Sequence, residues 1–169
     1  MLKKIKLRLF FVAISVIILQ ATCVPYVAVG TIRPDLFCAL FICLLIRHPN
    51  INAMYLAYII GIIKELYSNN FFGLEITSLV IPALFFPTII KKADIESYPV
   101  RVLIIFLFIL SSLFVFICSL IITEGAYHII NSLVNKLLGI ALYTTITALI
   151  MDHIIKICIP RKTVQYELF

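Results

Sequence analysis

Apolar residues fill six long runs of the chain, and polar residues gather in the short stretches between these runs. About 20 helical residues cross the hydrocarbon core of a bilayer, and fewer suffice where a helix is partly buried in protein. The pattern therefore predicts an all-α fold, a polytopic integral membrane bundle that forms a single membrane domain over residues 1–169. The six transmembrane helices are expected at residues 7–24, 34–46, 50–66, 73–90, 102–122 and 137–159.

The second and third runs are the shortest, and the polar stretch between them sets their arrangement. This stretch reads Arg47-His48-Pro49-Asn50, in which Pro and Asn break a helix and the charged and polar side chains favour water. We expect a tight helical hairpin here. The alternative is a re-entrant pair of helices that does not reach the far side of the membrane.

Composition supports the membrane assignment. Hydrophobic residues make up 63% of the 169 residues, mean hydropathy is +1.16, and only 13% of residues are charged. A water-soluble domain is usually about 45–50% apolar. The net charge of +6 comes from Lys and Arg at the ends of the runs. A nucleic-acid-binding protein gathers such residues on one folded face, so this distribution indicates topology and not nucleic-acid binding.

The distribution of the 14 Lys and Arg residues predicts the orientation. With the N-terminus inside, only Arg33, Lys64 and Lys136 lie on the outer side, which leaves eleven on the cytoplasmic side. The positive-inside rule therefore predicts that both termini are cytoplasmic. The basic residues before the first run resemble a signal peptide, but further spans follow, and we expect an uncleaved first span.

Sequence signals for catalysis or for metal binding are missing. The five Cys residues lie in or beside apolar runs without a CxxC pair, and we expect free thiols that act as small hydrophobes. The three His residues are far apart, and no GxSxG, P-loop or GxGxxG motif occurs. A lipid-modifying enzyme would need clustered acids and a metal, which the sequence does not supply. We therefore expect a protein without enzymatic activity, cofactor or metal.

Small residues recur every four positions in the third run, as Ala53, Ala57 and Gly61, and Glu65 continues the same stripe. Small residues at this spacing let another helix backbone come close within a membrane. The stripe predicts a tight helix contact, either within the chain or with a partner or second copy of the chain. Glu65 is either a functional carboxylate or an ion-pair partner of Lys64 or Arg33.

Helix-start and turn residues flank the second and third runs. Pro34 suits a first helical position and Asp35 suits the positive end of the helix dipole. Ser68 belongs to a turn, and Gly73 either caps the next helix or allows close approach. Arg33 is unusual because it adds a positive charge to the outer side.

The last run carries polar and small residues, including Thr144, Ala148 and Asp152. Asp152 and Lys156 are four residues apart, which predicts an ion pair along the helix. We expect this polar helix to be central in the bundle. The helix over 102–122 is mainly Ile, Leu, Phe and Val and is expected to face lipid.

Three segments together resemble a known family. They are Ile32-Arg33-Pro34-Asp35-Leu36, the stretch from Gly61 to Ser68, and Phe72-Gly73-Leu74. In this combination, residues 33–90 resemble the rod-shape-determining protein MreD family. Glu65 stands where that family usually has Asp, and Lys64 is an unusual charged neighbour.

The resemblance implies a non-enzymatic scaffold of the cell-elongation machinery in the bacterial inner membrane. It implies docking of the bitopic protein MreC and, indirectly, work with MreB, RodA and a class B penicillin-binding protein. It also implies a fold related to the membrane substrate-binding subunits of energy-coupling-factor transporters. The interface candidates are Arg33, Pro34, Asp35, Ala53, Ala57, Gly61, Glu65, Ser68 and Gly73.

The alternative is a small-molecule-binding transporter subunit of the energy-coupling-factor type. Arg33, Glu65, Glu75 and Thr77 would then line a pocket near the outer face.

Overall fold

The computed structural model describes residues 14–22, 24–28, 32–48, 52–68, 71–124 and 127–158, with the side chains of 124–135, 157 and 158 excepted. The described part is helical apart from turns and short connections, and the predicted all-α class is confirmed for it. A first helical segment covers residues 14–22. The helices that follow are α2 (Val24–Val27), α3 (Leu36–Arg47), α4 (Ala53–Tyr67), α5 (Leu74–Lys92), α6 (Tyr98–Glu124) and α7 (Tyr127–Cys158).

The helix boundaries agree closely with the apolar runs for α3, α4 and α5. Residues 7–13 of the predicted first helix lie outside the described residues. The predicted starts of the last two helices were too late, because α6 begins at Tyr98 and α7 begins at Tyr127. Backbone hydrogen bonds hold a helix whether its side chains are apolar or polar. The polar residues ahead of the last apolar run therefore continue its helix.

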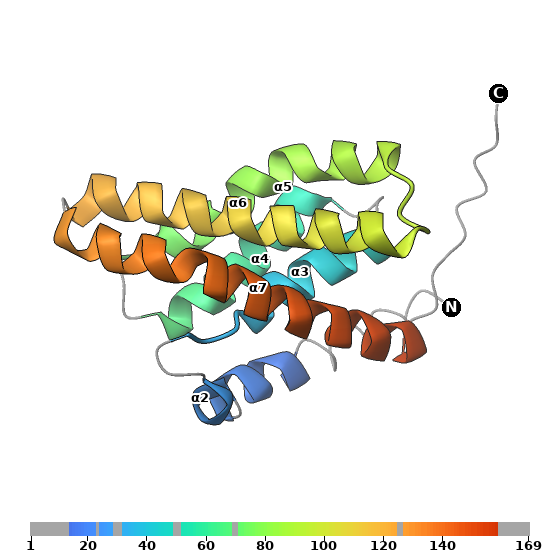
Figure 1. Cartoon of the computed structure of the whole chain (residues 1–169), viewed down its shortest axis with the longest axis horizontal. Helices are drawn as coiled ribbons and strands as arrows, with labels where there is room; N and C mark the ends of the chain where they lie inside the picture. Colours follow the sequence, from blue (N-terminus) through green and yellow to red (C-terminus); the bar gives the residue numbers. More distant parts are fainter. Residues whose placement is uncertain are drawn as a thin grey trace.

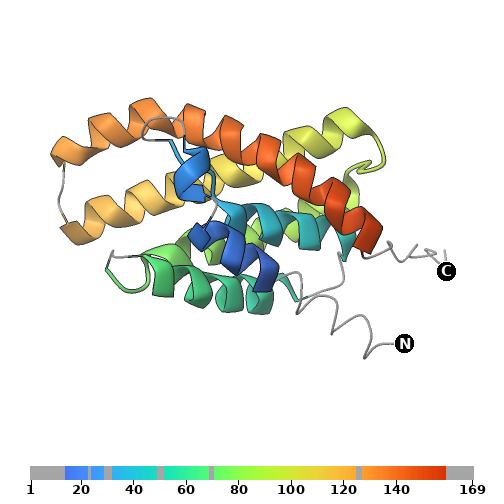
Figure 2. The same cartoon turned by 90° about the horizontal axis from the view of Figure 1, so that it is seen from below.

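The helices form an elongated bundle. Figures 1 and 2 show α6 and α7 side by side as a long hairpin, with α4 and α5 as a second antiparallel pair. α5 packs on α6, and α3 contacts all four of these helices. The start of α3, the end of α4 and the start of α5 lie close together, level with the middle of α6 and α7, whose hairpin extends beyond them. The end of α3, the start of α6 and the end of α7 lie at the opposite end of the bundle from the tip of that hairpin.

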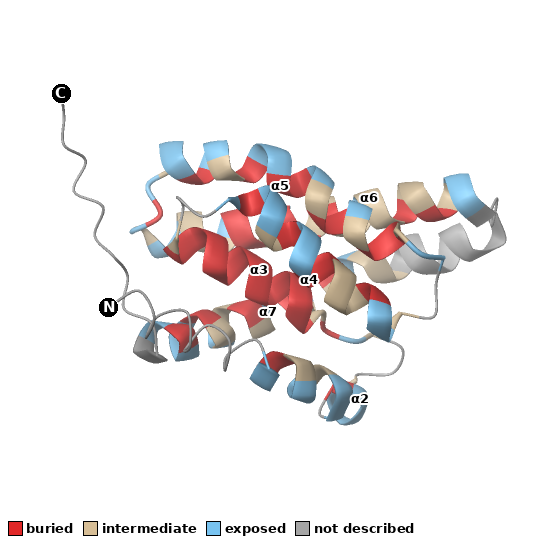
Figure 3. Ribbon diagram, turned by 180° about the vertical axis from the view of Figure 1, so that it is seen from behind, coloured by how far each residue is buried: buried red, intermediate tan, exposed pale blue. Residues whose placement is uncertain are grey.

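The short helix α3 is the central helix of the bundle. All of its 12 residues are buried, and it lies in the middle of the bundle in Figure 3. A helix that is apolar on every side is stable only where other elements surround it. The expectation that the last helix would be central is therefore wrong, since the spanning parts of α6 and α7 are each only 33% buried.

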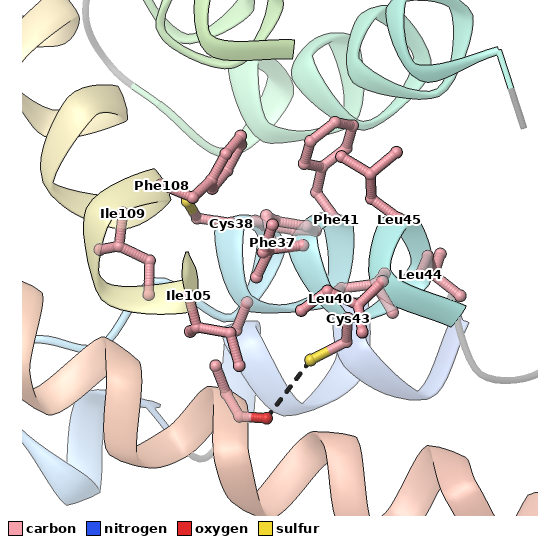
Figure 4. Close-up of a cluster of buried hydrophobic side chains, with 14 of the residues drawn as sticks. Phe37, Cys38, Leu40, Phe41, Cys43, Leu44, Leu45, Ile105, Phe108 and Ile109 are labelled. Atoms are coloured by element: carbon pink, nitrogen blue, oxygen red, sulfur yellow. Dashed lines mark hydrogen bonds between the residues drawn. The ribbon is translucent and has the colours of Figure 1, made fainter. Parts of the chain in front are cut away.

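The helix α6 contributes to the core and does not merely face lipid. Its Ile105, Phe108 and Ile109 side chains are buried beside α3 (Figure 4). The ring of Phe108 lies 5.1 Å from that of Phe41 and 5.0 Å from that of Phe86, measured between centroids. These aromatic contacts join α3, α5 and α6.

Among the described residues, three helices are long and apolar enough to cross a membrane, over Leu74–Lys92, Tyr98–Thr123 and Lys136–Lys156. The chain is accordingly a membrane protein. α3 has 12 residues, which span about 18 Å. Such a helix is too short to cross a bilayer alone, and it is accommodated because protein surrounds it. The six-span topology with both termini inside stays a prediction.

Candidate functional site

A buried charge cluster lies where α3 and α5 begin and α4 ends, level with the middle of α6 and α7. The ammonium group of Lys64 is 2.6 Å from Oδ2 of Asp35 and 2.7 Å from Oε2 of Glu75. The three side chains are 16%, 18% and 10% exposed. One ammonium therefore contacts two carboxylates in a setting that is largely shielded from solvent, where a charge without a partner of opposite sign is costly.

Asp35 is placed by hydrogen bonds from three parts of the chain. It is the N-cap of α3, and its Oδ1 accepts from the backbone N–H of Cys38 at 3.0 Å. Its own N–H donates to Oγ1 of Thr144 in α7 at 3.1 Å. The N–H of Leu36 donates to Oε1 of Gln20 in the first helical segment at 3.1 Å. The helix starts two residues later than predicted, because Pro34 precedes it and Asp35 is its N-cap instead of a residue of its first turn. α7 and the first segment hold this start in position.

Glu65 has a different role from the ion pair considered for it. One of its oxygens, Oε2, accepts from the backbone N–H groups of Glu75 at 3.0 Å and Ile76 at 3.2 Å. These are first-turn N–H groups of α5, which have no partner within their own helix and favour an anion. Lys64 and Glu65 are consecutive on α4 and do not face each other. Both nevertheless reach the start of α5, Lys64 through the Glu75 side chain and Glu65 through backbone N–H groups, and Lys64 also reaches Asp35 at the start of α3.

Gly73 is the N-cap of α5 and has φ of 104°. This left-handed conformation suits glycine, because a Cβ atom would strain the backbone there. Of the two predicted roles of Gly73, capping is therefore the one observed.

The small-residue stripe is used for packing within the chain. Ala53, Ala57, Gly61 and Glu65 are all buried. A Cβ atom on Gly61 would come within 2.9 Å of the Cα atom of Ile76 in α5. The predicted close helix contact is thus the one between α4 and α5. A role of the same stripe as a partner surface stays a prediction.

A pocket of about 350 Å³ opens beside the charge cluster. Its polar lining includes Arg33, Asp35, Lys64, Ser68, Glu75 and Ser112. Arg33 is exposed, and its side chain forms none of the ion pairs found among the described residues. Glu65 and Thr77, which the transporter alternative also placed in a pocket, do not line this one.

No family model, curated protein or solved structure matches this chain. The resemblance to the MreD family stays a prediction.

Of the nine interface candidates, the structure brings six together around the charge cluster. These are Arg33, Pro34, Asp35, Glu65, Ser68 and Gly73. Pro34 is buried, and Ser68 is the C-cap of α4.

Sequence reasoning did not pair Lys64 with Asp35 and Glu75. The sequence did carry a signal for this pairing, because a lysine within an apolar helix needs a carboxylate at the same depth in the membrane.

The other end of α3 carries a second charge cluster. Oδ1 of Asp152 is 2.7 Å from Nη2 of Arg47, and Oδ2 of Asp152 is 3.4 Å from Nη1 of Arg101. The predicted pair of Asp152 with Lys156 is wrong, because Asp152 turns into the bundle while Lys156 is exposed. The Arg47 side chain is 5% exposed, so its charge requires a buried partner.

Cys38 and Cys43 are buried free thiols in α3, as predicted. Sγ of Cys43 lies 3.3 Å from the carbonyl oxygen of Ala148 in α7 (Figure 4). Cys23 lies outside the described residues. Within the described part of the chain, no group of three His, Cys, Asp or Glu residues could hold a metal ion.

Proposed function

We propose that this protein is a non-enzymatic scaffold of the bacterial cell-elongation machinery, of the MreD type, that docks an MreC-like bitopic protein in the inner membrane. One observation carries the proposal. Six residues of the resemblance, spread between Arg33 and Gly73 in the sequence, lie together around the charge cluster. The buried residues among them hold α3, α4 and α5 in fixed positions beside a polar surface.

The docking surface we propose is the exposed rim of this polar surface. Arg33 is exposed there, and Tyr67, Phe71 and Phe72 are 50%, 60% and 81% exposed. Exposed aromatic residues and arginine are typical of residues that dominate binding energy at interfaces, and Tyr67 lines the same pocket as Arg33. The small-residue stripe is already covered by α5, so a partner helix would approach a different face of α4.

Recovery of the partner from native membranes tests the proposal. An MreC-like protein is expected to copurify with the tagged chain, and deletion of the gene is expected to round a rod-shaped cell. Arg33→Ala should reduce the recovered partner, whereas Lys91→Ala, at an exposed lysine in the last turn of α5, should not. Failure to recover an MreC-like partner, together with unchanged cell shape, would rule the proposal out.

The pocket beside the charge cluster favours one alternative, a small-molecule-binding transporter subunit. A volume of about 350 Å³ is within the range of sites for small ligands, and both signs of charge line it. A polar metabolite that copurifies with the chain, together with a copurifying ATPase, would support this alternative. An MreC-like partner without bound metabolite would contradict it.

A further inference from the structure

A second pocket, of about 520 Å³, lies between the start of α6 and the last turns of α7, away from the proposed docking surface. Its polar lining comes from Tyr98, Arg101, Asp152, His153 and Lys156. Leu149, Ile150 and Ile154 line it with apolar side chains. The pocket thus joins a charged region at the bundle end to an apolar region on the side of α7.

The charged region has an excess of positive charge. Arg47 and Arg101 share the single carboxylate of Asp152. Arg47 is buried, so the uncompensated charge is presented to the pocket by Arg101, whose side chain is 22% exposed. Lys156 adds an exposed ammonium group to the same lining. An anion that enters the pocket would therefore meet two cations.

Arg101 is held in a fixed orientation. Its Nε and Nη2 donate to the carbonyl oxygen of Ile95 at 3.2 and 3.0 Å, and its Nη1 donates to Asp152 at 3.4 Å. A guanidinium group has five N–H donors, and these bonds with described residues use three of them. Two donors remain for the oxygens of a ligand. Because the group is already oriented, little conformational entropy is lost on binding.

The apolar lining identifies the class of anion. Ile150 and Ile154 are 56% and 54% exposed on α7, which is one of the three helices suited to cross a membrane. An inorganic anion would not contact these apolar side chains, whereas a phospholipid would cover them with an acyl chain. Basic pockets between transmembrane helices are typical binding sites for anionic headgroups.

We propose that this pocket binds an anionic phospholipid. Its phosphate accepts hydrogen bonds from Arg101 and Lys156, and an acyl chain lies along Ile150 and Ile154. The inference does not depend on the scaffold proposal, because it uses a pocket away from the proposed docking surface, and the described residues that line this pocket all lie outside residues 33–90.

Native mass spectrometry of the full chain in micelles that contain equal amounts of phosphatidylglycerol and phosphatidylcholine tests the proposal. The unsubstituted chain should retain phosphatidylglycerol preferentially. Lys156→Gln removes one cation and should weaken this retention about fivefold. Lys92→Gln is the matched control, since Lys92 is an exposed lysine at the same end and does not line the pocket. It should leave retention unchanged.

Both lysines are exposed, so both variants are expected to fold, and thermal melting checks this. Equal loss in the two variants would show that diffuse charge attracts the lipid, and it would overturn the proposal. Displacement of phosphatidylglycerol by an equal concentration of inorganic phosphate would also overturn it, because the site would then bind a free anion. Equal retention of phosphatidylglycerol and phosphatidylcholine would also overturn the proposal.

Discussion

At the scale of single residues, Lys64 is the centre of the charge cluster beside the proposed docking surface. It contacts carboxylates from two other elements, Asp35 before α3 and Glu75 in α5. The loss of one member of a buried ion-pair network leaves a charge in a poorly solvated position without compensation. Lys64 therefore stabilises the fold mainly because its absence would strand two negative charges.

Replacement of Lys64 by Met is expected to lower the free energy of unfolding by about 3–5 kcal/mol. The Lys64 side chain is 16% exposed, so solvent screens the interaction only partly. Thermal unfolding in detergent, followed by circular dichroism, measures the change. Lys91→Met is the control, because Lys91 is exposed at the end of α5.

The double variant Lys64→Met, Glu75→Gln should regain part of the lost stability, since one stranded carboxylate is removed. Equal stability of the Lys64 and Lys91 variants would contradict the role given to the cluster.

Residue roles at helix starts could be predicted from the sequence, whereas ion-pair partners could not. Asp35 was expected in the first turn of α3 and is its N-cap, bonded to Cys38 three residues away, so local chemistry placed the helix start to within two residues. Arg47 and Asp152 are 105 residues apart, and only the packing of α3 against α7 brings them together. The pairing of Asp152 with Lys156 was predicted from their spacing of four residues along one helix. Asp152 instead pairs with Arg47, which is distant in the sequence.

At the scale of elements, the contact between α4 and α5 depends on Gly61. Its Cα lies so close to Ile76 that an added Cβ atom would be 2.9 Å from a backbone atom. The same approach lets Glu65, one turn later, reach the first N–H groups of α5. Helix packing and helix capping are therefore coupled at this contact.

Gly61→Ala is expected to destabilise the protein by about 1–3 kcal/mol, because a backbone atom must move. Gly139→Ala is the matched comparison. Its Cβ would meet Cδ1 of Ile32 at 2.8 Å, which is the end of a flexible side chain. We expect a smaller loss of melting temperature for Gly139→Ala. The reverse order would contradict the close packing of α4 on α5.

Helix positions followed from the apolar runs, but the position of α3 in the bundle did not. Uniform apolarity does not distinguish a lipid-facing helix from one surrounded by protein. The short length of α3 was the useful signal, since 12 residues cannot cross a bilayer unaided. Polar residues in the last helix suggested a central place, yet Asp152 needs only one buried side of α7 to meet Arg47.

At the scale of the whole molecule, the two charge clusters lie at opposite ends of α3. The end with Lys91, Lys92 and Arg101 carries more basic residues and is predicted to be cytoplasmic. The end with Arg33 and Lys64 is predicted to face outward.

Labelling of introduced cysteines tests this orientation. Phe72→Cys should react with a membrane-impermeant maleimide in intact cells, because Phe72 is 81% exposed at the predicted outer end. Lys92→Cys should react only after the membrane is permeabilised. The unsubstituted chain gives the background from its native cysteines. Labelling of Lys92→Cys but not Phe72→Cys in intact cells would reverse the predicted topology.

Site-specific photo-crosslinking in native membranes tests the proposed docking function most directly. A photoreactive amino acid is placed at position 33, which is exposed beside the charge cluster, and as a control at position 92 at the opposite end. The expected result is an adduct with an MreC-like bitopic protein from position 33 and none from position 92. Absence of that adduct at position 33, or equal adducts at both positions, would contradict the proposal.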